Sequence, residues 1–189
     1  MRVRLVYSKR YGACFVPHIA LAQIFSRSAV RAGLTPEMTQ GFSPRAKISF
    51  APELPAGVVA LNEPVDMFMQ DTDKDITALM NYALPEGFNV SRVIFPEDNS
   101  PSLGKLCTHA EYLLRSRRNC SIPSEFYGEA VVYADYIDDW LRLVISSPAQ
   151  NPIGGLVKFM IRENIIAGWH EINIVRSAIG SIIDGKVIL

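Results

Sequence analysis

The sequence predicts an α+β protein whose N-terminal half has the ferredoxin-like split βαβ arrangement, an antiparallel sheet covered on one face by two helices. Three observations predict this class. The chain opens on a polar–apolar alternation, and an apolar repeat of helical spacing follows. The two patterns then recur in the order strand, helix, strand, strand, helix, strand. A hydrophobic content of 49% with 20% charged residues is typical of a folded globular chain.

The elements of the first half follow from these patterns in order. The alternation in Arg2–Tyr7 predicts a half-buried strand. Pro17 suits a first helical position, and apolar residues at i, i+3, i+4 spacing extend this helix to about Ala32. Gly33 fits the position just past a helix end. The later elements are strands at about 46–51 and 64–70, a helix near 73–83 with an Asp-rich first turn, and a strand at 88–95.

The second half reads as a shortened version of the first. Strands are predicted at about 108–115, 130–137 and 140–146, a helix at 152–162, and a closing hairpin of 172–178 and 181–188 around Asp184-Gly185. The stretch between the halves is rich in Pro, Ser, Asp and Asn, which is typical of a linker. We therefore expect a ferredoxin-like basic half at 1–96, a linker at 97–105 and a second, related α+β half at 106–189.

Composition also bounds the compartment and the cofactors. The longest apolar runs are far shorter than the roughly 20 residues of a membrane span, and the start has no signal-peptide core, so we expect a cytoplasmic protein. Cys14, Cys107 and Cys120 show no metal-binding spacing and are expected to be reduced and buried. No metal or cofactor is expected on this chain.

The charge of the chain is balanced overall but not along its length. Residues 1–60 hold eight basic and two acidic side chains, and the remaining 129 residues hold 11 basic and 17 acidic ones. The net charges of +6 and −6 predict that the N-terminal third faces an anionic partner. The alternative is that these charges scatter over a solvated surface and partly pair with the acidic remainder.

The run TQGFSPRAKISF, from Thr39 to Phe50, is the most unusual loop in the sequence. Gly41 permits backbone angles that expose amide groups to an anion, and Arg45 and Lys47 add positive charge. Arg45 would grip a phosphate or carboxylate with two hydrogen bonds. The alternative is a structural turn in which Phe42 fills the core and Pro44 stiffens the chain.

Further candidate residues lie before this loop. His18 starts the first helix, where the positive helix end and nearby cations would lower its pKa and favour the neutral form suited to a general base. Arg27 and Arg31 lie one turn apart and would contact a phosphate backbone, although a solvated helix face explains them equally. Candidates beside the first strand are the basic Lys9 and Arg10 and the aromatic Tyr7, Tyr11 and Phe15, interleaved as in proteins that bind single strands. At least one of these three rings is expected to pack into the core instead.

Several short runs resemble one bacterial family, the radical-SAM-associated domain of unknown function, which is fused to radical SAM proteins or encoded as a separate chain. The matching runs are YSK from Tyr7, FVPH from Phe15, FSR from Phe25, RAGL from Arg31, QGFSP from Gln40, KISFA from Lys47, LPAG from Leu54 and NIVRS from Asn173. They are dense through residues 1–60 and thin from about 116 to 170.

The chain departs from that family at two motifs. The family has Ser-His-Leu-Asp where this chain reads Pro17-His-Ile-Ala20, and Pro-His-Pro where it reads Pro44-Arg-Ala46. An aspartate and a second histidine are therefore missing. The resemblance implies association with a radical SAM enzyme, and the iron–sulfur cluster and S-adenosylmethionine would belong to that partner.

The leading hypothesis is a non-catalytic accessory protein that binds RNA, tRNA foremost, and presents it to a radical SAM partner. In this hypothesis Tyr11 and Phe42 would stack on bases, and phosphates would be held by Arg10, Arg27, Arg31, Arg45 and Lys47. A second hypothesis is a metal-independent ribonuclease that uses His18, by analogy with ferredoxin-like ribonucleases that process CRISPR repeats. A third is a module that docks an acidic patch of the radical SAM partner. The sequence does not indicate the oligomeric state.

Overall fold

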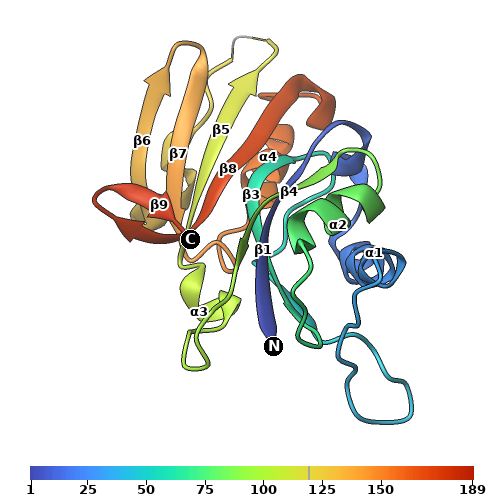
Figure 1. Cartoon of the computed structure of the whole chain (residues 1–189). Helices are drawn as coiled ribbons and strands as arrows, with labels where there is room; N and C mark the ends of the chain where they lie inside the picture. Colours follow the sequence, from blue (N-terminus) through green and yellow to red (C-terminus); the bar gives the residue numbers. More distant parts are fainter. Residues whose placement is uncertain (119) are drawn as a thin grey trace.

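The computed structural model of the chain describes residues 1–118 and 120–189 and confirms the α+β class. Its described strands form one mixed sheet of nine strands with the main order β4-β1-β3-β8-β5-β7-β6. Two short strands lie off this path, β2 beside β3 and β9 beside β8. Figure 1 shows the sheet running through the whole molecule. No helix of the described residues is both long and apolar enough to cross a membrane.

The first half has the predicted split βαβ connectivity. Its strands are ordered β4-β1-β3-β2, and every neighbouring pair is antiparallel. Helix α1 connects β1 to β2 and helix α2 connects β3 to β4. The bounds are Arg2–Lys9 for β1, His18–Arg31 for α1, Ile48–Phe50 for β2, Val59–Phe68 for β3, Ile76–Ala83 for α2 and Phe88–Ile94 for β4. A short 3₁₀ helix, η1 (Tyr11–Phe15), precedes α1.

The second half repeats this strand order with a reduced first connection. When the strands of each half are numbered along the chain, the order β8-β5-β7-β6 is fourth, first, third, second. The first half has the same order. The 3₁₀ segment η2 stands where the first half has α1. The bounds are His109–Ser116 for β5, Ser124–Ala130 for η2, Val131–Ile137 for β6, Trp140–Ser146 for β7, Ile153–Arg162 for α4, Trp169–Glu171 for the 3₁₀ helix η3, Ile172–Ile183 for β8 and Lys186–Ile188 for β9.

The two halves meet where β3 and β8 run parallel. Val59 pairs with Val175 and Ala60 with Arg176. Buried apolar side chains form two clusters, one between β1, β3, β4 and the helices α1 and α2, and one beneath α4. Residues before β3 and at its start, including Leu54, Val58 and Ala60, belong to the second cluster, so the core beneath α4 draws on both halves. The division at residues 97–105 stays a prediction.

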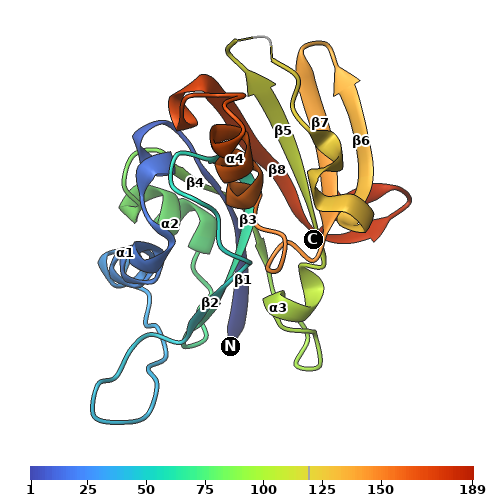
Figure 2. The same ribbon diagram turned by 180° about the vertical axis from the view of Figure 1, so that it is seen from behind.

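The helices of the second half leave one face of its strands free. Helix α4 lies behind β3 and β8 in Figure 1 and in front of them in the reverse view of Figure 2. Alternate residues of β5 are buried along its length, as expected for an antiparallel strand with one packed and one open face.

Local sequence explains most element ends. Gly33 follows α1 with φ +70°, a conformation that favours glycine. The Asp75 carboxylate accepts a hydrogen bond of 3.0 Å from the Ala78 amide and caps α2, so the Asp-rich turn is a helix start. The Asp138-Asp139 turn joins β6 to β7, and Asp184-Gly185 joins β8 to β9, as predicted.

Three differences from the predicted elements reflect long-range contacts. Strand β8 runs unbroken from Ile172 to Ile183, because its middle residues pair with β5 through Gly180. A short helix, α3 (Leu103–Leu106), lies in the predicted linker, where the apolar Leu103 is buried in the second cluster. Strand β3 begins at Val59 instead of Pro64, because its first residues pair with β8.

Candidate nucleic-acid interface

The unusual loop of the sequence forms a projecting arm, residues 37–47. The Lys47 amide donates to the Glu37 carbonyl at 2.8 Å, and the Thr39 amide donates to the Arg45 carbonyl at 2.7 Å. The Thr39 hydroxyl in turn accepts a bond of 3.0 Å from the Arg45 amide. These bonds make the arm a small two-stranded ladder, and Figure 1 shows it reaching away from the body of the molecule next to α1.

The tip of the arm presents an aromatic ring to solvent. Phe42 is fully exposed, and Gly41 beside it has φ +127°. The alternative in which Phe42 fills the core is therefore wrong. The ladder of the arm holds the backbone on either side of the tip, so the ring is displayed from an ordered base. A ring exposed in this way can stack on a planar group.

A cleft of about 530 Å³ separates the arm from α1. Arg27 enters it from the helix and Arg45 from the arm, so the cleft brings together two of the basic residues predicted from the sequence. No carboxylate is among its described lining residues, which are Ile19, Ala22, Gln23, Ser26, Arg27, Met38, Pro44, Arg45 and Ala46. Two guanidinium groups in an acid-free cleft are suited to an anion such as phosphate.

His18 lies at the start of α1 and is half-buried. Its ring centroid is 5.5 Å from that of Phe50 in an edge-to-face contact. Burial lowers the pKa of His18, and the opposing effect of the Glu53 carboxylate is smaller. The expected direction is confirmed, but the leading cause is burial and not neighbouring cations. The neutral form suits a base, and a catalytic role stays a prediction.

Lys9 was expected to contact a substrate at the surface, but it is buried. It ends β1 with a side chain only 2% exposed, and its ammonium donates to the Val16 carbonyl at 3.2 Å. Burial lowers its pKa, and the nearby Glu63 carboxylate opposes that effect. Because the ammonium lies inside the protein, Lys9 does not contact a substrate at the surface.

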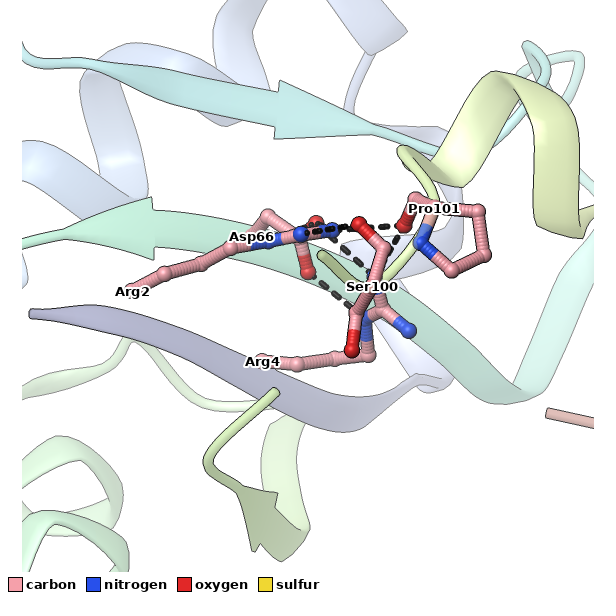
Figure 3. A network of polar contacts seen from close by, with 5 residues as sticks. All are labelled: Arg2, Arg4, Asp66, Ser100 and Pro101. Atoms are coloured by element: carbon pink, nitrogen blue, oxygen red, sulfur yellow. Dashed lines mark hydrogen bonds and ion pairs between the residues drawn. The ribbon is translucent and has the colours of Figure 1, made fainter. Parts of the chain in front are cut away.

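Two further N-terminal arginines are also engaged inside the fold. Arg2 and Arg4 both point to the Asp66 carboxylate of β3, as Figure 3 shows. The Arg4 Nε donates to Asp66 at 2.7 Å and the Arg2 Nη2 at 2.5 Å, and Asp66 is only 2% exposed. The Arg2 guanidinium also donates to the carbonyls of Ser100 and Pro101 in the segment between the halves. Several of the positive charges in residues 1–60 therefore stabilise the fold and do not face a partner.

The other predicted basic residues divide in the same way. Arg31 ties α1 to the end of α2 through a bond of 2.6 Å from Nη2 to the Ala83 carbonyl. Lys47 pairs with Glu37 at 3.1 Å across the base of the arm, and the Lys47 hydrogen bond lowers the pKa of Glu37. Arg10 and Tyr11 are exposed at the start of η1, away from the arm in the chain. The structure therefore brings together Arg27 and Arg45 in the cleft, while the other basic candidates lie outside its lining.

A second concavity was not anticipated from the sequence. A groove of about 850 Å³ is lined by Arg115, Arg117, Trp140 and Trp169, residues that no sequence argument singled out. The sequence carries one signal here, the basic run from Arg115 to Arg118, which begins at the end of the strand predicted at 108–115. Among the described residues, no three His, Cys, Asp or Glu side chains gather as a metal site.

Residues 2–142 match a family model described as an uncharacterized protein conserved in bacteria, DUF2344. The chain belongs to the DUF2344 family. The match runs from the start of β1 into β7 and includes the arm, α1 and the residues around Asp66. No curated protein matches the chain. The family is described as uncharacterized, so membership of DUF2344 does not assign an activity to the chain.

Proposed function

We propose that this DUF2344 protein is a non-catalytic accessory protein that binds RNA, with tRNA as the first substrate class to test. The observation that carries the proposal is the cleft between α1 and the arm, where Arg27 and Arg45 converge without a carboxylate. Phosphate groups supply most of the affinity in such complexes, and arginine binds them with two hydrogen bonds.

The arm adds a stacking group to this charge. Phe42 is exposed at the tip, a few residues from Arg45 in the same ladder. Proteins that bind single-stranded nucleic acid combine a basic track with aromatic rings on which bases stack. In the proposed complex, Arg27 and Arg45 hold phosphates and Phe42 stacks on an adjacent base.

The proposed setting is a bacterial radical SAM system in the cytoplasm. The support is the resemblance of the FVPH and QGFSP motifs, which lie at the start of α1 and at the tip of the arm. In this proposal the partner carries the iron–sulfur cluster and S-adenosylmethionine, and the DUF2344 chain contributes substrate binding.

The double variant Arg27→Gln/Arg45→Gln tests the site. Fluorescence anisotropy of labelled tRNA should show an affinity at least roughly tenfold weaker than for the parent, because two phosphate contacts are removed. Arg92→Gln is the matched control, since Arg92 is an exposed arginine on β4 that lines neither the cleft nor the groove. Equal affinity and equal salt dependence of the double variant and the parent would overturn the site.

A second candidate function is docking of the radical SAM partner by the same region. The favouring observation is apolar, because Ile19 and Met38 are exposed beside the cleft and Phe42 is exposed on the arm. Co-purification with the partner that survives ribonuclease treatment and is lost in Phe42→Ser would support docking. Loss of the complex on ribonuclease treatment would support RNA binding instead.

A further inference from the structure

The groove that Phe15 of η1 lines combines aromatic and basic side chains. It holds about 850 Å³ and is formed where β5 ends and β7 and β8 begin. Both tryptophans of the chain line it. The described lining contains two arginines and one histidine and no carboxylate.

The tryptophans and arginines are held by specific contacts. Trp140 starts β7, and the Arg115 guanidinium lies 5.6 Å from the centre of its ring, the geometry of a cation–π pair. Trp169 belongs to η3, and the edge of its ring lies beside Gly154 of α4. A Cβ atom on that glycine would be 3.9 Å from the ring. The two indoles therefore come from different elements and are positioned by the fold.

Of the two arginines in the groove, Arg117 has a neutral hydrogen-bond partner and Arg115 has a carboxylate partner. Arg117 donates to the neutral side-chain oxygen of Asn173 at 3.1 Å. Arg115 forms an exposed ion pair of 3.1 Å with Asp139, a carboxylate that does not line the groove. The nearby buried Glu171 is engaged by Arg118 at 2.5 Å. The Arg117 guanidinium is thus free of a carboxylate partner among the described residues.

We infer that this groove binds a short single-stranded segment of RNA, with bases stacked on Trp140 and Trp169 and a phosphate on Arg117. Aromatic stacking and an arginine-lined track are the usual basis of single-strand binding without sequence preference. The inference rests on the proposed function in taking RNA as the ligand, and it adds a second contact region.

The two regions are close enough for one RNA to reach both. Phe15 of η1 lines the groove, and Ile19 of α1 lines the cleft beside the arm. Their Cα atoms are at most about 15 Å apart, because consecutive Cα atoms are separated by about 3.8 Å. A strand that leaves the groove past Phe15 therefore arrives at α1 within a few nucleotides.

Intrinsic tryptophan fluorescence reports this groove alone, because the cleft contains no tryptophan and the chain has only these two. We expect oligouridylate to quench the emission of the full-length protein on titration. Trp140→Phe and Trp169→Phe, each with one indole, should both retain part of the quenching. Arg117→Gln should weaken oligouridylate binding by about threefold to tenfold, with Arg92→Gln as control.

A stacking variant completes the test. Trp140→Ala should reduce oligouridylate affinity roughly fivefold or more, since stacking on one ring contributes strongly to single-strand binding. If Trp140→Ala fails to fold, Arg117→Gln and the two phenylalanine variants still decide the question.

The outcomes separate this inference from the proposed function. tRNA binding that depends on Arg27 and Arg45 but leaves tryptophan emission unchanged would overturn the groove and keep the cleft. Quenching by oligouridylate that survives the Arg27→Gln/Arg45→Gln double variant would support the groove, and the cleft would be overturned if the tRNA affinity of that variant also equalled that of the parent. Absence of any RNA binding would overturn both. If uridine monophosphate bound as tightly as oligouridylate, the groove would be a site for a single nucleotide and not for a segment of single-stranded RNA.

Discussion

At the scale of single residues, the position of a basic side chain along a strand decided its role more than its charge did. Arg2, Arg4 and Lys9 all lie on β1, and each is turned into a buried or partly buried environment. The alternation that predicted β1 was recognised in the sequence. It predicts solvent-facing polar positions, because nothing local indicates that Asp66 and the segment after β4 cover that face.

Asp66→Asn tests this structural role. The substitution leaves the Arg2 and Arg4 guanidinium groups partly buried without a carboxylate, so the free energy of unfolding should fall by about 3–5 kcal/mol. Urea denaturation followed by circular dichroism measures the loss. Glu37→Gln, at the exposed pair with Lys47, is the matched control and should change stability little. Equal losses in the two variants would contradict the assignment.

His18 gives a prediction for the pH dependence of stability. Burial lowers its pKa in the folded protein, so below about pH 6.5, the value in an unfolded chain, the unfolded state binds more protons. Its contribution to stability is therefore present near neutral pH and is lost as the pH falls below that value. His18→Gln should lose less stability than the parent between about pH 7 and pH 5.

Denaturation series for both proteins at several pH values provide the comparison, since the carboxylates contribute equally to each. NMR titration of the ring gives the second readout. A His18 pKa above the unfolded value, or identical pH profiles for the two proteins, would refute the buried placement of this ring.

At the scale of elements, the sequence predicts the strands and helices well because each has its own local pattern. The apolar repeat gave α1 and the Asp-rich turn gave the start of α2. The failures concern long-range contacts. Gly180 lies within a continuous β8 because β5 pairs with it, and the start of β3 forms because β8 lies beside it. Neither partner is visible in the local sequence.

The contact between β3 and β8 contains a buried ion pair that links the two halves. Arg176 of β8, only 1% exposed, donates from Nε to the Glu63 carboxylate of β3 at 2.7 Å. Its Nη2 donates to the same carboxylate at 2.5 Å and to the Pro52 carbonyl at 3.0 Å, while Nη1 is buried without a partner among the described atoms. Burial alone would lower the pKa of Arg176, but the Glu63 charge raises it overall.

A double-mutant cycle tests this link. Arg176→Met should lower the free energy of unfolding by about 3–5 kcal/mol, because Glu63 is left buried without its partner. The double variant Arg176→Met/Glu63→Leu should lose less stability than the sum of the losses of the two single variants. The difference, which is the coupling energy, should be about 1–3 kcal/mol. Thermal or urea denaturation of the four proteins gives the values. Strict additivity would mean that the pair does not couple the strands.

At the scale of the whole molecule, two halves with the same strand order share one sheet, and both concavities lie beside the chain that connects β1 to β2. The cleft uses α1 and the arm, which the sequence identified through Arg27, Phe42 and Arg45. The groove uses Phe15 from the first half and residues of β5, β7 and η3 from the second. Because its arginines and tryptophans are far apart in sequence, only the assembled sheet brings them together.

The central claim is that the surface formed by the cleft and the groove binds RNA through phosphates. Its most direct test is the affinity of the parent protein for tRNA, measured by fluorescence anisotropy at several salt concentrations. Of the arginines that line the cleft and the groove, Arg27, Arg45 and Arg117 are exposed and Arg115 is half-exposed, so about three to four phosphate contacts are expected. The logarithm of the affinity should then fall against the logarithm of salt with a slope of roughly −2 to −4. No binding at low salt, or an affinity independent of salt, would contradict the claim.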